Sequence, residues 1–325
     1  MVKFLIIQTA FIGDVILATP IIEKLHHFYP NAEIDFLLRK GNENLLKNHP
    51  YVSNILIWNK KENKFKNLYK IIKLIRSKKY NYVINIQRFA STGIITAFSG
   101  GKIKVGFNKN PFSFLFTRRI KHEIGSGKHE VERNIKLISE ITDDSVYNPK
   151  LYPSDEDFQI VSQYKMRPYI CMAPTSVWFT KQFPAEKWIE LISRIGNEYH
   201  VYLLGGPDDK EACNKIMEAC SRSNIDNLCG KLSFLQTSAL MKNASMNYVN
   251  DSAPMHMASA MNAPTTAIFC STIPGFGFGP LSDNARIIET EENLDCRPCG
   301  LHGYKKCPKE HFSCAYSIKT EQLLF

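Results

Sequence analysis

The sequence predicts an α/β protein of two Rossmann-like domains, each built on a parallel sheet. Its 325 residues suit two domains better than one. Short β-rich runs alternate with helical stretches, which is typical of βαβ units. A polar segment with two prolines, residues 143–157, interrupts this alternation, which then resumes. We therefore expect an N-terminal domain over residues 1–153 and a C-terminal domain over residues 154–325.

In the N-terminal half, runs rich in β-branched and aromatic residues predict five strands. They are Val2–Gln8, Glu33–Leu38, Asn54–Trp58, Tyr82–Gln87 and Lys102–Phe107. Helices are expected to begin near Asp14, Asn42, Phe65 and Ser91, with a further helix over His129–Ile141.

In the C-terminal half, strands are expected over residues 169–174, 200–206, 247–252 and 264–270. Pro184 opens a predicted helix, a favoured position for proline, and a second helix is predicted over residues 253–261. Ligands of such sheets bind outside the carboxyl ends of the strands. The turns that follow the strands are therefore the places to look for a site.

The composition limits the classes of partner and compartment. A net charge of +10 indicates an anionic partner, and no zinc-finger, RNP-type or basic-zipper motif points to nucleic acid. The apolar runs are too short to span a bilayer, and no signal peptide is evident. Nine cysteines, an odd number scattered through apolar segments, do not resemble a secreted disulfide framework. We expect a cytoplasmic protein.

The first turn, "QTAFIGD", places Gly13 and Asp14 between a strand and a helix. It lacks the G-x-G-x-x-G pattern of dinucleotide oxidoreductases. Asp14 could cap the helix, since Asp is a preferred N-cap residue, or it could serve as a base. Taken alone, the turn favours the interpretation of Asp14 as a helix cap over that of a base.

Two turns of the C-terminal half could bind a nucleotide. "TSVWFTKQFP" offers Thr175, Ser176 and Lys181 before a helix start, which suits an anion, although a solvated loop is the simpler interpretation. "LLGGPDDKEAC" places Gly205 at a strand end and Glu211 in the next helix. Glu211 could accept from ribose hydroxyls or simply favour the helix dipole.

The turn "NDSAPMHMASA" carries the strongest signal in the C-terminal half. Asp251 and Ser252 follow a strand, and His256 lies in the first turn of the next helix. Backbone N–H groups at such a helix start could face a diphosphate. A lone histidine on a helix usually has a structural role, but here it follows a strand-end turn.

Five segments in order resemble glycosyltransferase family 9, the lipopolysaccharide heptosyltransferase family. They are "GDVILATPIIEKLHHFYPNAEIDFLLRK", "NIQRFASTGIITAFSGGKIKVGF", "APTSVWFTKQFPAEKW", "LLGGPDDKEA" and "NDSAPMHMASAMNAPTTAIF". The resemblance implies a GT-B fold, with the parallel sheets of two Rossmann-like domains facing across a cleft. It implies an inverting, metal-independent glycosyltransferase that moves a heptose from ADP-heptose to the lipopolysaccharide core. A catalytically inactive nucleotide-binding regulator or scaffold on the same fold is the alternative.

The resemblance also implies roles for individual residues. Asp14 matches the catalytic base, Lys181 the phosphate-binding lysine and Glu211 the ribose-binding carboxylate. Asp251 and His256 match the donor-binding signature, and with them we place Thr175, Ser176, Gly205 and Ser252. Acceptor binding is expected of the N-terminal domain, through Gln87, Arg88 and Arg119.

Residues 60–80 carry nine lysines and arginines, with Phe65, Leu68, Ile72 and Ile75 at helical spacing. One interpretation is a helix that covers the sheet and has a solvated basic face. The other is a patch for anionic lipid or for the phosphorylated acceptor. Together with the resemblance, such a patch suggests that the acceptor is a lipid-linked anionic oligosaccharide. It also suggests that the protein has a peripheral location on the cytoplasmic face of the inner membrane.

Four cysteines near the C-terminus form C-x2-C-x7-C-x6-C. They are Cys296, Cys299, Cys307 and Cys314. Four thiolates with a C-x2-C start suit tetrahedral zinc, while free thiols or a disulfide are the alternatives. Such a closed zinc site would be structural, and the resemblance implies that catalysis needs no cofactor.

Overall fold

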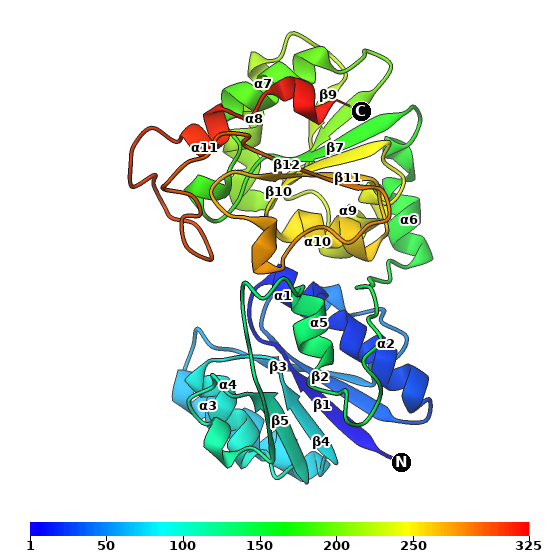
Figure 1. Cartoon of the computed structure of the whole chain (residues 1–325). Coiled ribbons are helices and arrows are strands. Elements are labelled where there is room, and N and C mark those ends of the chain that lie inside the picture. The colour runs from blue at the N-terminus through cyan, green and yellow to red at the C-terminus, as the bar shows by residue number, and fades with distance from the viewer. Residues whose placement is uncertain (325) are drawn as a thin grey trace. The chain divides into compact units, whose positions relative to one another are not determined.

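A computed structural model describes residues 1–324 of the chain, which forms two compact units, Met1–Tyr152 and Pro153–Phe325. The division lies one residue before the boundary expected from the sequence. Each unit has a six-stranded parallel sheet with helices packed beside it (Figure 1). The predicted two-domain α/β class is confirmed, whereas the cleft between the sheets stays a prediction.

The sheet of the N-terminal unit has the strand order β3-β2-β1-β4-β5-β6. Its strands are β1 (Lys3–Ile7), β2 (Glu33–Arg39), β3 (Asn54–Trp58), β4 (Tyr82–Asn85), β5 (Ile103–Phe107) and β6 (Arg118–Ile120). Its helices are α1 (Ile12–Ile16), α2 (Thr19–Phe28), α3 (Lys64–Lys78), α4 (Ala90–Phe98) and α5 (Glu130–Ile135). The helix expected near Asn42 is a single 3-10 turn, Glu43–Leu45, and Pro50 follows soon after it. The expected helix over His129–Ile141 ends as an α-helix at Ile135.

The sheet of the C-terminal unit has the order β12-β11-β10-β7-β8-β9. Its strands are β7 (Tyr169–Ala173), β8 (His200–Leu203), β9 (Ile225–Asn227), β10 (Met246–Asn250), β11 (Thr265–Phe269) and β12 (Ala285–Glu289). Its helices are α6 (Asp155–Val161), α7 (Ala185–Arg194), α8 (Lys210–Ala219), α9 (Phe234–Met241), α10 (Ala253–Ala260) and α11 (Ser313–Tyr316).

Three short strands, β6, β9 and β12, were not expected from the sequence. All three lie at sheet edges, where part of each strand is exposed. An edge strand needs no continuous apolar run, so segments such as "RRI" and "IDN" give little strand signal. Pairing with a buried neighbour completes each sheet.

Both sheets reverse their strand order at one point, between β1 and β4 in the first unit and between β7 and β10 in the second. In open parallel sheets ligands bind at the carboxyl ends of the strands at this point. Asp14 follows β1 and Gln87 follows β4. Lys181 follows β7 and Asp251 follows β10. The topology therefore places predicted site residues at both reversal points.

Helix α3 covers the N-terminal sheet with a narrower apolar stripe than the spacing predicted. Ile71 and Ile75 are buried, and Leu68 and Ile72 pack beside them. Phe65 was expected on the same stripe, but its side chain is 82% exposed. It lies in the first turn, before the helix reaches the core, so that prediction was wrong. Within residues 1–324, no helix is both long and apolar enough to cross a bilayer.

Candidate functional site

Asp14 lies in the first turn of α1, but it is not the N-cap residue. Phe11 occupies that position, and its backbone N–H donates to Oδ2 of Asp14 at 3.2 Å. The side chain is half-buried. Asp14 thus satisfies one free N–H at the helix start and still presents a carboxylate at the reversal point of the sheet.

The surroundings of Asp14 weaken its acidity. Burial raises the pKa of Asp14 from 3.8 to about 6, and the nearby Glu130 carboxylate is the next largest cause. The Phe11 N–H and Arg39 lower this pKa by smaller amounts. General bases work best with a pKa near the operating pH. The environment therefore gives Asp14 a property that a simple helix cap does not need.

No sequence pattern singled out Glu130 or Arg39, which lie near Asp14. Arg39 ends β2, the neighbour of β1 in the sheet, so the strand order would have indicated it. Glu130 opens α5, far along the chain, and no local pattern links it to Asp14. His122, with Nε2 at 3.7 Å, and next Arg133, with Nε at 2.7 Å, keep the pKa of this carboxyl below its usual value despite burial.

The acceptor candidates differ in how free they are. The buried side chain of Gln87 accepts from the Thr9 hydroxyl at 2.7 Å, so it has an internal role. Arg88 is half-buried and Arg119 is exposed on β6. In the described part of the chain, neither arginine forms an ion pair with a carboxylate. Arg88 and Arg119 are thus the two candidates with a charge to offer an anion.

In the C-terminal unit, Lys181 ends a 3-10 turn that follows β7. Its Nζ lies 2.6 Å from Oδ2 of Asp251, and the same oxygen accepts from the Thr272 hydroxyl at 2.6 Å. The Lys181 side chain is only 14% exposed. Residues that follow β7, β10 and β11 thus form one network, and Asp251 orients the ammonium group.

Asn250, the last residue of β10, was missed by sequence analysis. Its Nδ2 donates to the Pro174 carbonyl at 2.8 Å, and its Oδ1 accepts from the Phe183 N–H at 3.0 Å. It therefore ties the loop that bears Lys181 to the end of β10. A polar residue ending a fully buried strand was the available signal.

The other donor candidates line the same end of the sheet. Thr175 and Ser176 are half-buried in the loop after β7. Ser252 is the N-cap residue of α10, and its hydroxyl donates to the Asn250 carbonyl at 3.4 Å. His256 is buried in α10. These residues lie near the ends of β7 and β10.

Gly205 and Glu211 follow β8 and stand apart from this network. A Cβ at Gly205 would lie 2.8 Å from Cβ of Asp209 and 2.9 Å from Sγ of Cys229, so close packing requires glycine there. The Glu211 side chain is 81% exposed and pairs with Lys215, one turn along α8, at 2.8 Å. It is accessible to a ribose but is not held in place.

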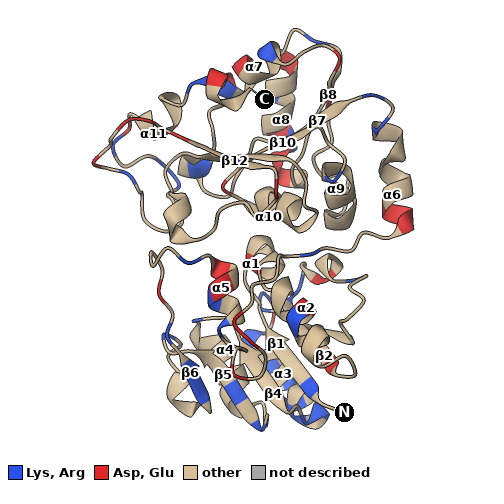
Figure 2. Ribbon diagram, turned by 45° about the vertical axis from the view of Figure 1, so that its right-hand side comes forward, with Lys and Arg blue, Asp and Glu red and all other residues tan. Residues whose placement is uncertain are grey.

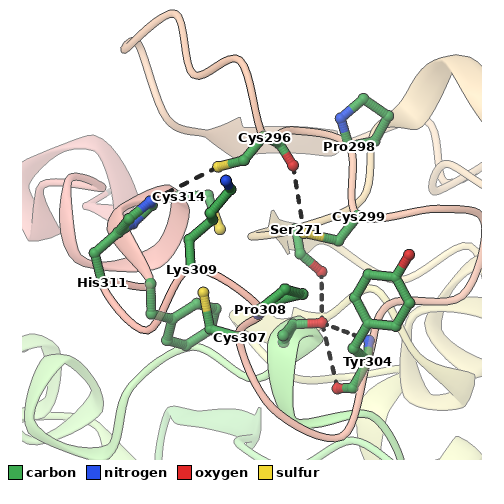
Figure 3. Close-up of a pocket in the computed structure, with 12 residues that line it drawn as sticks. Ser271, Cys296, Pro298, Cys299, Tyr304, Cys307, Pro308, Lys309, His311 and Cys314 are labelled. Carbon is green, nitrogen blue, oxygen red and sulfur yellow. Dashed lines mark hydrogen bonds between the residues drawn. The ribbon is translucent and has the colours of Figure 1, made fainter.

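The four C-terminal cysteines line a cavity of about 250 Å³ together with His311 (Figure 3). All nine cysteines are free thiols. Across residues 1–324, no group of three or more His, Cys, Asp or Glu side chains is arranged to hold a metal ion. The structure therefore does not support the predicted structural zinc. Spacing brings the cysteines to one cavity but does not set where they point: the Cys299 thiol donates to the Cys296 carbonyl at 3.4 Å.

The fold is that of a two-domain α/β protein with a candidate ligand site at the reversal point of each parallel sheet. The model of glycosyltransferase family 9 (heptosyltransferase) matches residues 68–305, and the chain belongs to this family. It is therefore a glycosyltransferase, as predicted from the sequence.

Individual relatives agree with this assignment. The chain is 29% identical over 281 residues to lipopolysaccharide heptosyltransferase 3 of Escherichia coli, covering 81% of this chain and 82% of that protein. A glycosyl transferase of family 9 from Veillonella parvula has the same fold, with a TM-score of 0.86, 21% identity and coverage of 99% and 94% of the two chains. ADP-heptose lps heptosyltransferase II of E. coli gives a TM-score of 0.78, with 22% identity and coverage of 99% and 100%.

Proposed function

We propose that the protein is an inverting heptosyltransferase that moves a heptose from ADP-heptose to the lipopolysaccharide core. The names of its relatives support both substrates. The observation that carries the proposal is that the chain has both a carboxylate with a raised pKa in the N-terminal unit and a lysine held by Asp251 in the C-terminal unit. The relatives favour this function over the inactive alternative.

On the donor side, Lys181 contacts the diphosphate of the nucleotide sugar. When the sugar leaves, negative charge grows on the diphosphate, and a fixed ammonium group stabilises it. The N–H groups at the start of α10, beside Ser252, and the hydroxyls of Thr175 and Ser176 add donors. Glu211 accepts from the ribose hydroxyls. We propose that this arrangement replaces a metal ion.

On the acceptor side, Asp14 removes the proton from the attacking hydroxyl. In an inverting transfer the acceptor oxygen bonds to the anomeric carbon as the bond to the diphosphate breaks on the opposite face. The proton passes to Oδ of Asp14, which is ionised at neutral pH because its pKa is about 6. Arg88 and Arg119 bind anionic groups of the acceptor.

We also propose that the enzyme works at the cytoplasmic face of the inner membrane and contacts it through α3. Figure 2 shows basic residues along this helix. Phe65 and Tyr69 are 82% and 68% exposed, and exposed Lys66, Lys70 and Lys73 lie among them. Exposed aromatic rings among lysines are typical of helices that lie in a bilayer interface.

Two other basic residues of the 60–80 stretch face inward and take no part. Lys60 donates to the Thr9 carbonyl at 2.8 Å, and Lys78 pairs with Asp35 at 2.8 Å. Replacing Lys66, Lys70 and Lys73 by Ala removes three outward charges, each worth about 1 kcal/mol at an anionic surface, so binding to phosphatidylglycerol vesicles should fall about 100-fold.

The matched control removes three exposed lysines of the C-terminal unit: Lys210, Lys231 and Lys242. Cosedimentation with phosphatidylglycerol vesicles and with neutral phosphatidylcholine vesicles measures both variants. Equal binding of the α3 variant and the control would exclude α3 as the membrane surface.

The decisive test of function is transfer itself. Purified protein is mixed with ADP-heptose and a lipopolysaccharide core that lacks the terminal heptose, and both ADP release and the mass of the acceptor are followed. We expect one heptose added per ADP released. Tight binding of ADP-heptose with no transfer to any truncated core would support the inactive nucleotide-binding alternative instead.

A further inference from the structure

The cysteine-rich segment, residues 290–312, is a long loop outside the C-terminal sheet (Figure 1). The segment reaches the network of Lys181, Asp251 and Thr272 at Thr180, the residue before Lys181. The Thr180 N–H donates to the Tyr304 carbonyl at 3.1 Å, and the Tyr304 N–H donates to Oγ1 of Thr180 at 2.8 Å. The Ser271 hydroxyl donates to the same Oγ1 at 3.0 Å (Figure 3). Thr180 is 1% exposed, so water does not replace these contacts.

Gly303 brings the same loop against Lys181 itself. Its φ is +75°, and an added Cβ would lie 2.8 Å from Oγ1 of Thr180 and 3.3 Å from Cγ of Lys181. The backbone of the loop therefore packs on the stem of Lys181. Only a residue without a Cβ allows this approach.

The loop also supports the Asp251 side of the network. The Cys299 N–H donates to the Ser271 carbonyl at 2.8 Å, and Arg297 donates to the Thr272 carbonyl at 2.8 Å. Thr272 is the residue whose hydroxyl donates to Asp251. The segment thus contacts the neighbours of both members of the Lys181–Asp251 pair.

We infer that the cysteine-rich segment is a positioning element for the donor site, with Thr180 and Gly303 as the positioning residues that set where the Lys181 ammonium lies. The inference rests on the proposed role of Lys181 in diphosphate binding. It gives the segment a function that needs neither a metal nor a disulfide.

The test measures ADP affinity by calorimetry and the KM for ADP-heptose. Thr180→Val keeps the shape of the side chain but removes the oxygen that Tyr304 and Ser271 contact. We expect it to weaken ADP binding about 10-fold, because small misplacements of a binding group are costly. Thr180→Ser keeps the oxygen and should restore most of the affinity. Thr265→Val is the matched control, since Thr265 is buried at the other end of β11 and its hydroxyl donates to the Ala263 carbonyl at 2.8 Å.

Two glycine variants separate the effect of backbone strain on ADP binding from the effect of contact with Lys181. Gly303→Ala and Gly300→Ala both place a Cβ at positive φ, +75° and +64°. At Gly300 the nearest atom is Oη of Tyr304, at an ordinary 3.5 Å. We expect only Gly303→Ala to weaken ADP binding beyond the effect of its lower stability. Equal ADP affinity of the two variants would overturn the inference.

A double-mutant cycle distinguishes positioning from general support of the fold. If Thr180 acts through Lys181, Thr180→Val should cost no further ADP affinity in a Lys181→Ala background. A full second loss would show that Thr180 acts otherwise and would refute the inference. Unchanged ADP affinity of Lys181→Ala alone would instead refute the proposed donor site. A loss for Lys181→Ala with none for Thr180→Val or Gly303→Ala would refute only the positioning role.

Discussion

Replacing Asp14 by Asn should abolish most turnover and yet stabilise the protein. Asn can still accept from the Phe11 N–H, as Asp14 does at 3.2 Å, so the helix start keeps its contact. An amide cannot take the acceptor's proton, and general-base catalysis contributes about 10²–10⁴-fold, so turnover should fall by that factor.

The stability effect follows from the pKa of Asp14, which burial raises from 3.8 to about 6. Because the folded-state pKa is the higher one, folding takes up a proton between these pH values. The contribution of Asp14 to stability is therefore most favourable below about pH 4, falls as pH rises through this window, and is lower by about 3 kcal/mol above pH 6. Asp14→Asn removes this cost, and the gain at pH 7 should be about 3 kcal/mol at most, vanishing near pH 4.

Urea unfolding of both proteins at pH 4 and pH 7 measures the gain, and the pH profile of kcat/KM measures the role in catalysis. Wild-type activity should fall on the acid side with a midpoint near pH 6, leaving about one-tenth at pH 5. Glu130→Gln removes a carboxylate that raises this pKa, so the midpoint should move to lower pH. Near-normal turnover of Asp14→Asn would refute the catalytic role. A midpoint unmoved in Glu130→Gln would refute the electrostatic argument.

Four further outcomes are expected. Lys181→Ala should weaken ADP binding about 10- to 100-fold in calorimetry, because a charge-assisted contact is worth about 1.5–3 kcal/mol; unchanged affinity would contradict the donor site. Glu211→Gln should raise the Kd for ADP while leaving that for pyrophosphate unchanged, and Lys215→Ala is the control that breaks only the surface pair. Gly205→Ala should destabilise the C-terminal unit in urea, since its Cβ would lie 2.8 Å from Asp209. Thiol titration of protein denatured without reductant should find nine thiols per chain, and a count of seven would reveal a disulfide.

Much of the fold followed from local patterns. Central strands such as β1 and β7 carry nearly continuous apolar runs, FLII and YICMA. Such runs need no distant partner to be recognised, because a parallel sheet buries both faces of a central strand. The edge strands β6, β9 and β12 were not predicted, because pairing with a neighbouring strand, and not composition, makes these segments strands.

For the candidate site too, the sequence predicted the positions of residues but not their electrostatic surroundings. The sequence alone placed Asp14 and Lys181 in strand-to-helix turns and Glu211 in the helix after such a turn. Parallel sheets bring the carboxyl ends of their strands to one edge, so these positions were candidates for a site. The pKa of Asp14 was not evident from the sequence, since the carboxylate that helps to raise it, Glu130, comes from a helix more than 100 residues away.

The C-terminal cysteines show the limit most clearly. Their spacing suggested zinc, but spacing does not determine side-chain directions, and the four thiols face a cavity without forming a metal-binding group. The loop does contact Thr180 and Ser271: Tyr304 bonds Thr180, 124 residues earlier in the chain, and Cys299 bonds Ser271. Only tertiary packing brings Tyr304 to Thr180, because hydrogen bonds between distant segments leave no periodic trace in the sequence.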